Sequence, residues 1–364
     1  MLADLRVLEG AADRLCDLAP GPGEGGECIA DLVLRGAPLI GDLPVGVPQP
    51  MSQISELRGC GVPRIAGGIC RRIVLVRLHL LDGTYELFRA HFGRKDSVPG
   101  PGGTDIRATL GILESTLALL REPGVTHLAA SFDTVIESFR NDMFTGYKTS
   151  AGMDPDLLAQ FPDAERALEA IGVVVWRNIE YEADDAMATA ALRWVEDVDQ
   201  VVIVSPDKDM SQLFLGDRIV GYNRREQRII DEAGVVEKFG VHPESIPDYL
   251  ALVGDTADGV PGLPGWGARS ASAVLVRYRR LEMIPPDAAD WEVTVRGADK
   301  LAATLIDRMA DALLYRDLTT LRFDVPIEED LGDLEWRGVP HERFVSFCGE
   351  MGFDPEAIRV ERWA

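Results

Sequence analysis

The regular part of the chain alternates short apolar runs with amphipathic stretches. Four apolar runs, at residues 73–81, 127–132, 172–176 and 201–205, are typical of strands that are buried on both faces. Helical patterns separate them at 107–120, 155–170 and 183–195, and Asp154 followed by Pro155 suits an N-cap and first turn. Buried strands that alternate with helices predict an α/β fold, with a parallel sheet covered by helices on both faces.

The two flanks of this region follow other patterns. After about residue 244 the strand pattern stops, and short helical runs with Gly/Pro turns predict a helical subdomain. Residues 1–70 are dense in Gly and Pro after a possible short helix, and we interpret them as a loose or disordered extension or as sequence upstream of the true start. A partner-binding arm is the alternative. The expected organisation is therefore 1–70, 71–243 and 244–364.

Charge and cysteine content limit the function classes. The chain has 37 Lys+Arg against 60 Asp+Glu, a net charge of −23, which by itself argues against nucleic-acid binding. An acidic total still allows a local basic path, and a site for divalent cations is itself acidic. The five cysteines form no C-x-x-C pair, which argues against structural zinc. With no apolar segment of about 20 residues and no signal peptide, we expect a cytoplasmic protein without a membrane partner.

Acidic residues follow all four predicted strands. Because the carboxyl ends of parallel strands meet at one edge of a sheet, we expect seven carboxylates to converge there. They are Asp82, Asp133, Glu182, Asp184, Asp185, Asp207 and Asp209. Packed carboxylates require protonation or bound cations, and oxygen ligands select Mg²⁺ or Mn²⁺. Two such ions about 3.5–4 Å apart can activate water and stabilise the leaving oxygen of a phosphodiester. A single residue such as Asp185 could merely cap a helix, but acids at four strand ends favour a metal site.

A glycine-rich segment at 252–271 carries the second set of candidates. Its glycines allow backbone N–H groups to approach a phosphate, and a helix that starts near Ala268 points its N-terminus at the same place. The candidate DNA contacts are Gly262, Gly265, Gly267, Arg269 and Ser270. Asp255 and Asp258 would complete a second metal site. The alternative is an ordinary tight loop between two helices.

Together these residues resemble the 5′→3′ exonuclease and flap endonuclease family, including the 5′-nuclease domain at the N-terminus of bacterial DNA polymerase I. The matching stretches are 81–83, 87–90, 132–133, 139–140, 147–148, 182–185, 207–210 and 254–267. The resemblance implies a PIN-like domain followed by a helix–three-turn–helix element. It implies a 5′→3′ deoxyribonuclease, monomeric, acting on DNA with a 5′ single-stranded end or flap.

The same resemblance implies roles for individual residues. Two Mg²⁺ or Mn²⁺ ions would be held by Asp82, Asp133, Glu182, Asp184, Asp185, Asp207, Asp209, Asp255 and Asp258. An arch between Asp133 and Asp154 would admit the 5′ strand, and Arg89, Arg140 and Lys148 would contact the scissile phosphate and its neighbours. Tyr147 would either stack on a base or simply pack in the arch.

Several positions depart from the family pattern. Ala151 replaces a second basic residue after the Tyr-Lys pair, and Val135 and Glu137 occupy a region that is often lysine-rich. Pro206 and Gly259 replace a common Gly and Asn. The thinner cationic lining motivates an alternative, a DNA-junction binding protein with weak or no catalysis, although intact Asp207 and Asp209 favour the enzyme. A toxin-like PIN ribonuclease is a third reading, which the glycine-rich segment at 254–271 counts against.

Overall fold

The computed structural model describes residues 75–94 and 96–364. The expectations for residues 1–70 therefore lie outside the described part of the chain. Within the described part, no helix combines the length and the apolar character that crossing a bilayer requires.

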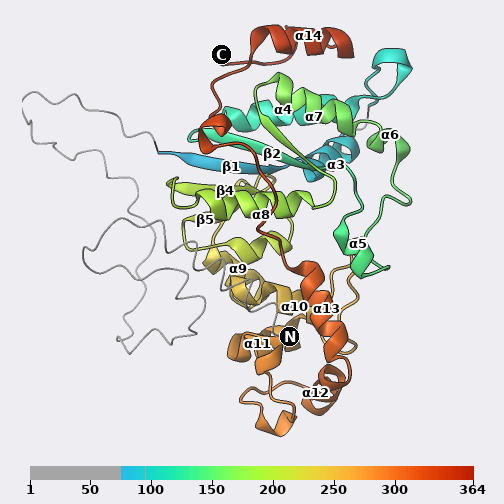
Figure 1. Cartoon of the computed structure of the whole chain (residues 1–364), viewed down its shortest axis with the longest axis vertical. Coiled ribbons are helices and arrows are strands. Elements are labelled where there is room, and N and C mark those ends of the chain that lie inside the picture. Colours follow the sequence, from blue (N-terminus) through green and yellow to red (C-terminus); the bar gives the residue numbers. More distant parts are fainter. Residues whose placement is uncertain (1–74, 95) are drawn as a thin grey trace, which may run out of the picture. The chain divides into compact units, whose positions relative to one another are not determined.

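A six-stranded sheet forms the centre of this part, with strand order β3-β2-β1-β4-β5-β6 (Figure 1). The strands are β1 (Arg77–Asp82), β2 (His127–Asp133), β3 (Val174–Asn178), β4 (Gln200–Val204), β5 (Ile219–Asn223) and β6 (Arg228–Ile230). The first five are parallel, as predicted, and β6 pairs antiparallel with β5. The sheet is therefore mixed at its edge. The hairpin of β5 and β6 was not predicted.

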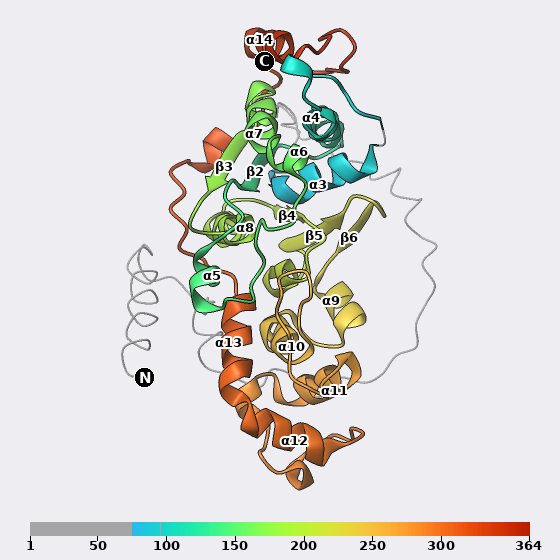
Figure 2. The ribbon, with the colours of Figure 1, turned by 90° about the vertical axis from the view of Figure 1, so that its right-hand side faces the viewer.

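Helices cover both faces of the sheet, as predicted. On one face lie α3 (Gly83–Gly93), α4 (Arg107–Leu120) and α7 (Phe161–Ala170), and on the other lies α8 (Ala183–Trp194) (Figures 1 and 2). The alternation along β4 explains the two layers: Val201 and Ile203 join the core on the α8 side, while Val202 and Val204 join the core on the α3 side.

The helix expected at 155–170 is divided into α6 (Pro155–Leu158) and α7. Pro162 lacks the N–H that would continue the ladder to Leu158, which favours a break there. Between the two helices lies buried Gln160, whose Oε1 accepts the backbone N–H groups of Ala108 at 3.0 Å and Thr109 at 3.1 Å. The break thus positions the Gln160 side chain to accept backbone N–H groups in the first turn of α4, although Gln160 lies about 50 residues further along the chain.

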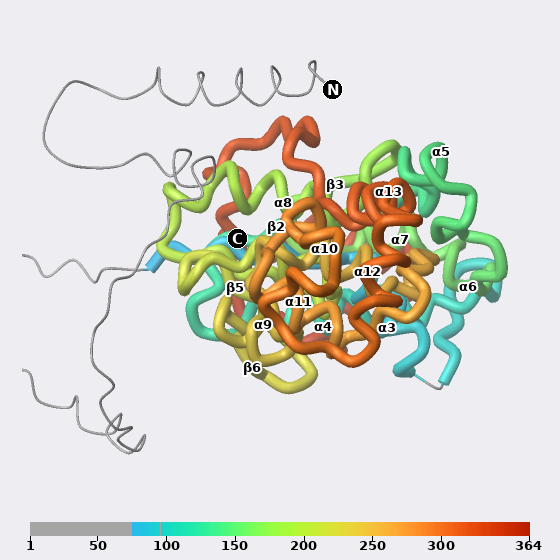
Figure 3. Tube along the Cα trace, turned by 90° about the horizontal axis from the view of Figure 1, so that it is seen from below, coloured from blue at the N-terminus to red at the C-terminus, as the bar shows by residue number. Residues whose placement is uncertain are grey.

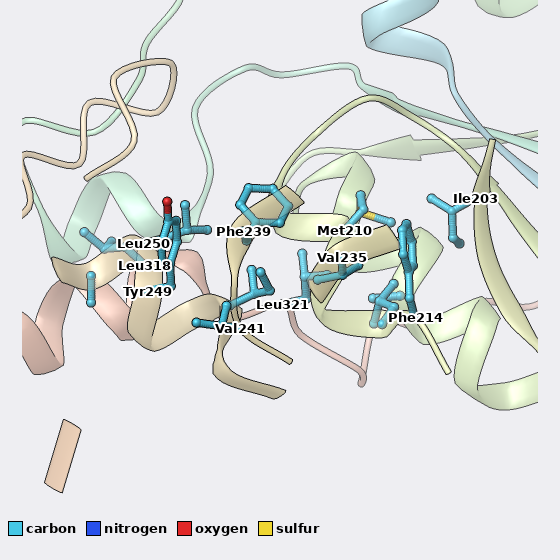
Figure 4. Close-up of a cluster of buried hydrophobic side chains, with 14 of the residues drawn as sticks. Ile203, Met210, Phe214, Val235, Phe239, Val241, Tyr249, Leu250, Leu318 and Leu321 are labelled. Atoms are coloured by element: carbon cyan, nitrogen blue, oxygen red, sulfur yellow. The ribbon is translucent and has the colours of Figure 1, made fainter. Parts of the chain in front are cut away.

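The helical region follows β6. It contains α9 (Glu232–Phe239), α10 (Ile246–Val253), α11 (Ala268–Tyr278), α12 (Ala298–Asp307) and α13 (Met309–Thr319). These helices lie below the sheet in the views of Figures 1 and 2, and they face the viewer when the molecule is seen from below (Figure 3). Short 3₁₀ turns lie at Pro101–Gly103, Asp209–Leu213, Pro243–Ser245, Leu281–Met283, Ala288–Asp290 and Leu331–Leu334. One apolar core runs from Ile203 and Met210 in the α/β part to Leu250 and Leu318 in the helices (Figure 4). The described residues accordingly belong to one compact unit, and the position near 243 is a change of architecture within it.

The end of the chain returns to the α/β part, which the expected region 244–364 did not anticipate. Trp336 donates its backbone N–H to Thr126 O at 3.0 Å, and its Nε1 donates to Ile171 O at 2.9 Å. Beyond it, α14 (His341–Met351) packs on α7 (Figure 1). The buried side chains of Phe344, Phe347 and Met351 therefore complete the core on the α3 side of the sheet.

Candidate metal centre and nucleic-acid face

Four aspartates gather at the carboxyl ends of the central strands: Asp82, Asp133, Asp184 and Asp207. Asp82 ends β1, and its two oxygens accept the Tyr85 N–H at 2.8 Å and the Ser205 hydroxyl at 2.8 Å. Burial raises the pKa of Asp82 to about 7, and the charges of Asp133 and Asp207 contribute to that rise. Burial and the charges of Asp207 and Asp82 likewise raise the pKa of Asp184 well above its usual value. These carboxylates are close enough to oppose one another's ionisation.

Three further aspartates form a second group beside the first. One carboxylate oxygen from each of Asp209, Asp255 and Asp258 lies within 4.8 Å of the others. All three residues are buried, and Asp209 Oδ1 has no hydrogen-bond partner among the described residues. Burial raises the pKa of Asp209 well above its usual value. The negative charge of Asp207 contributes more to this rise than the charges of Asp258 and Asp255. Asp207 thus adjoins both groups, and a buried unpartnered carboxylate oxygen suits a cation.

Glu182 lies in a contrasting environment at the same edge. Ser138 Oγ donates to it at 2.6 Å, Tyr147 OH donates at 3.2 Å, and Lys148 Nζ lies 2.9 Å away. Burial alone would raise its pKa, but the charges of Lys148 and Arg140 outweigh burial and lower the pKa of Glu182 to about 2. Glu182 therefore stays ionised more readily than Asp82, Asp184 or Asp209.

Asp185, which was expected to be a metal ligand, pairs with Arg140 in the structure. Both of its oxygens accept from the Arg140 guanidinium, at 2.7 and 2.8 Å. The same oxygens also accept the backbone N–H groups of Arg322 at 2.8 Å and Glu182 at 3.1 Å. Each oxygen of Asp185 is thus engaged by one guanidinium N–H and one backbone N–H, which makes Asp185 the structural partner of Arg140.

The structure places Arg140 inside the protein, and it favours the packing alternative that was left open for Tyr147. The Arg140 side chain is 3% exposed and fully engaged inside the protein, so it does not contact a phosphate in this arrangement. It lies on α5 (Phe139–Met143), at the base of the expected arch. Tyr147 is buried and its hydroxyl donates to Glu182, which supports packing and excludes base stacking by a ring held in this position.

Two lysines bring positive charge into the carboxylate groups. Lys148 Nζ lies 3.0 Å from Asp258 Oδ1 as well as beside Glu182, and the Lys148 backbone N–H donates to Asp258 O at 3.0 Å. Lys208, which the sequence reasoning did not single out, pairs with Asp255. The segment expected to form the arch is therefore joined directly to the loop that carries the second aspartate group.

Close packing of that loop depends on Gly259. Its φ is +76°, and a Cβ there would lie 2.2 Å from the Gly146 carbonyl oxygen. An L side chain would be both strained and in collision at this position. The departure to glycine at 259 thus allows the loop to approach the expected arch, which places Asp258 beside Lys148.

The glycine-rich turn between α10 and α11 has one buried and one exposed end. Gly262 is buried, with φ +71°, and its missing Cβ would lie 2.5 Å from Gly254 N. Gly262, expected as a phosphate contact, forms the turn and is buried in the structure. Gly265 and Arg269 are exposed, while Gly267 and Ser270 are partly exposed and hydrogen-bonded to each other. The N-terminus of α11 is consequently the accessible part of this element.

A basic pocket beside the first aspartate group was missed by the sequence reasoning. It has a volume of about 510 Å³ and is lined by Arg89, Arg224, Arg225, Ser205 and Pro206, among other residues. Arg89 and Arg224 both bind Glu86 and Ser115, with Arg224 Nη1 2.7 Å from Glu86 Oε2. The adjacent arginines at 224 and 225 were the available signal, but their hairpin was not recognised as part of the sheet.

Acids at the ends of parallel strands, joined to a glycine-rich turn that opens a helix, define the class of PIN-like nuclease folds. The chain belongs to the 5′–3′ exonuclease family. The model of the 5′–3′ exonuclease N-terminal resolvase-like domain matches residues 77–240, and that of the 5′–3′ exonuclease C-terminal SAM fold matches residues 241–342. The resemblance and the fold class expected from the sequence are thereby confirmed.

Relatives and solved structures agree with this assignment. The chain is 34% identical over 265 residues to DNA polymerase I of Mycobacterium leprae, covering 71% of this chain and 28% of that protein. It is 30% identical over 289 residues to DNA polymerase I of Bacillus caldotenax, covering 78% and 32%. The chain thus spans about three tenths of the length of these relatives.

Two solved structures share the fold at low identity. A T5 5′-exonuclease structure with bound zinc ions has a TM-score of 0.54 at 18% identity, covering 67% of this chain and 89% of that one. The catalytic core of Rad2 in complex with DNA substrate has a TM-score of 0.53 at 14% identity, covering 78% and 90%.

Proposed function

We propose that this chain is a metal-dependent 5′→3′ exonuclease or flap endonuclease that hydrolyses phosphodiester bonds in DNA. The observation that carries the proposal is the pair of adjoining carboxylate groups that share Asp207, one of which contains the unpartnered buried oxygen of Asp209. Membership of the 5′–3′ exonuclease family supports the same activity.

The residues present fit two divalent cations with oxygen ligands. Asp82, Asp133, Glu182, Asp184 and Asp207 would hold one ion, and Asp209, Asp255 and Asp258, with Asp207 between the groups, would hold the other. Carboxylates alone favour Mg²⁺ or Mn²⁺ over Zn²⁺. When bound, such ions supply an activated water and neutralise the leaving oxygen. Zinc in the T5 5′-exonuclease structure supports a cation site in this fold, while the choice of Mg²⁺ or Mn²⁺ rests on the ligand chemistry.

The chain's own residues would position the DNA. Lys148, already within the carboxylate groups, is the cation best placed to meet the scissile phosphate. The exposed N-terminus of α11, with Arg269, suits duplex phosphates that are bound without regard to base sequence. Arg89, Arg224 and Arg225 add positive charge beside the first aspartate group. The DNA bound by the Rad2 core supports this class of substrate.

Cleavage of 5′-end-labelled flap, nicked and single-stranded DNA, with and without Mg²⁺, tests the proposal. We expect release of short 5′ products from at least one of these substrates, and no cleavage after stripping with EDTA. Robust cleavage in excess EDTA would contradict metal dependence. The preferred substrate would distinguish exonuclease from flap endonuclease action.

A second function, DNA-junction binding with weak or no catalysis, is favoured by one observation. Arg140 is buried, so the expected arch offers Lys148 without the second cation that the resemblance implied. Tight, Mg²⁺-independent binding of a flap substrate together with no detectable cleavage at saturating Mn²⁺ would establish this alternative.

A further inference from the structure

Arg140 joins three separate parts of the molecule. Its Nη1 and Nη2 donate to the two oxygens of Asp185 on α8, at 2.7 and 2.8 Å. Its Nε donates to Leu318 O at 2.8 Å, and Nη2 also donates to Thr320 O at 3.1 Å. The two carbonyls belong to the end of α13, so one buried guanidinium on α5 binds both the α/β part and the helical region.

The same guanidinium also reaches the metal centre. Nη1 lies 3.2 Å from Glu182 Oε1, on the carboxylate that Ser138 and Lys148 contact as well. Asp185 completes the connection, since its Oδ1 accepts the Arg322 N–H at 2.8 Å just beyond α13. The end of α13 and the Glu182 carboxylate are therefore held by a shared set of hydrogen bonds.

We propose that Arg140 is a positioning residue that orients Glu182 for cation binding and couples the end of α13 to the metal centre. This inference rests on the proposed function. Its basis is the planar fork of the guanidinium, which donates in several fixed directions at once. A lysine in this place keeps the charge but cannot bind Asp185 in two directions while also donating to Leu318 and Thr320.

The test is Mn²⁺ affinity of the full chain without DNA, measured by isothermal titration calorimetry for wild type, Arg140→Lys and Thr189→Val. Thr189 is the matched control because its hydroxyl donates to the Asp185 backbone carbonyl at 2.9 Å and accepts the Val325 N–H at 3.3 Å, so it supports the same segment without touching Glu182. We expect Arg140→Lys to weaken Mn²⁺ binding by about 10–100-fold, as for other residues that orient metal ligands. Thr189→Val should lower Tm while leaving Mn²⁺ affinity within about twofold.

Three outcomes would overturn the inference. The first is unchanged Mn²⁺ affinity in Arg140→Lys together with weaker DNA binding, which would make Arg140 a phosphate contact. The second is an equal loss of Mn²⁺ affinity in Thr189→Val, which would reduce the effect to general loosening. The third concerns Ser138→Ala, the variant to use if Arg140→Lys does not fold: it removes a 2.6 Å hydrogen bond to Glu182, and unchanged Mn²⁺ affinity would show that Glu182 orientation is not limiting.

Failure of this inference differs from failure of the proposed function. A wild-type chain that binds Mn²⁺ but cleaves no DNA would contradict the nuclease proposal and still permit the Arg140 test. A wild-type chain that cleaves DNA, with Arg140→Lys binding Mn²⁺ equally well, would contradict the role of Arg140 alone.

Discussion

Neighbouring carboxylates at the proposed metal centre differ in how readily they bind a proton. Burial raises the pKa of Asp82 to about 7, whereas Lys148 and Arg140 overcome burial and lower the pKa of Glu182 to about 2. Near neutral pH the Glu182 carboxylate is ionised, whereas the Asp82 carboxyl is still partly protonated. A divalent cation that binds as proposed would displace protons from some of these carboxylates, so its affinity should depend on pH.

The first prediction concerns stability against pH in EDTA. A carboxyl whose folded pKa is raised stabilises the fold fully below its unfolded pKa of about 3.9 and loses that contribution as pH rises through the folded pKa. Asp82, at about 7, therefore predicts a falling Tm from about pH 6.5 to 8, and Asp184 and Asp209 act in the same direction. Below about pH 6.5 the lowered pKa of buried His79 acts oppositely, which limits the useful window.

Differential scanning fluorimetry with EDTA and with Mg²⁺ measures this effect. The rise in Tm on adding Mg²⁺ should be larger at pH 8 than at pH 6.5, because fewer protons compete for the carboxylates. Asp82→Asn is the control, and it should flatten the dependence in EDTA. A Tm that increases with pH across this window in EDTA would contradict the assignment.

The second prediction is that Asp207→Asn abolishes cleavage but keeps or improves DNA binding. Asp207 adjoins both carboxylate groups, so its loss should lower single-turnover cleavage by at least about 10²-fold, comparable to removing one preorganised electrostatic group. Removal of one negative charge also reduces repulsion of phosphate. A band-shift assay in Ca²⁺ beside a cleavage assay in Mg²⁺ checks both parts, and a folded variant that loses binding as well would count against this role.

The sequence predicted that the acids would gather at the carboxyl edge, where the structure has them, but it did not separate the carboxylates that face the cluster from Asp185, which binds Arg140. Parallel strands bring their ends together, which is why the edge could be predicted. Successive helical residues are about 100° apart, however, so Asp184 and Asp185 at the start of α8 cannot face the same way. Which of them faces the cluster depends on Arg140, and that contact spans 45 residues of sequence.

At the scale of elements, the N-terminus of α11 and the segment carrying Lys148 have separate places in the structure. Arg269 is exposed at the start of α11, whereas Lys148 lies among the carboxylates. Arg277, further along α11, is already paired with Glu292 at 2.8 Å. Arg269 is therefore the better candidate for a duplex phosphate contact.

The third prediction compares Arg269→Ala with Lys148→Ala. Arg269→Ala should weaken binding about equally across unrelated sequences and reduce the salt dependence by roughly one unit of slope. Lys148→Ala should slow single-turnover cleavage by about 10²-fold with little loss of duplex affinity. Binding against salt concentration, paired with single-turnover cleavage, distinguishes the two. If Lys148→Ala lowered only duplex affinity and Arg269→Ala lowered only the cleavage rate, the roles assigned to these two residues would be wrong.

Elements with strong local patterns were predicted more accurately than those defined by pairing. The apolar periodicity of 107–120 corresponds to α4 (Arg107–Leu120), because its buried positions repeat at helical spacing. Strand β6 has only Arg228, Ile229 and Ile230, and it exists through its register with β5. Such a short edge strand leaves no periodic signal in the sequence. Because the hairpin was not predicted, the basic pocket that Arg224 and Arg225 line was not predicted either.

At the scale of the whole molecule, the net charge is −23, yet Lys and Arg side chains gather around the clustered acids. Lys148 and Lys208 contact the second aspartate group, and three arginines line the pocket beside the first. Overall acidity is therefore compatible with a phosphate-binding face. Because the acidic residues elsewhere on the protein repel DNA phosphates, DNA affinity should depend strongly on salt and on bound metal.

The fourth prediction is that deleting residues 1–70 leaves nuclease activity intact. The family models match residues 77–342, and none of the candidate ligands lies before Asp82. The shortened chain should cleave a flap substrate within about twofold of the full chain and unfold at a similar Tm, as expected for a change outside the features that usually carry large effects. A marked fall in Tm or rate would show that this segment supports the nuclease.

The return of the last residues to the sheet has a consequence for synthesis on the ribosome. Trp336 and α14 cover the side of the sheet formed by α7, although they are made about 165 residues after Ile171, to which Trp336 is hydrogen-bonded. During synthesis the apolar surface of α7 therefore stays uncovered until the whole helical region and then α14 have been made. Such surface favours chaperone binding or self-association. The core on this side of the sheet is complete only after residues 336–351 have been made, so a product truncated before them should aggregate more readily.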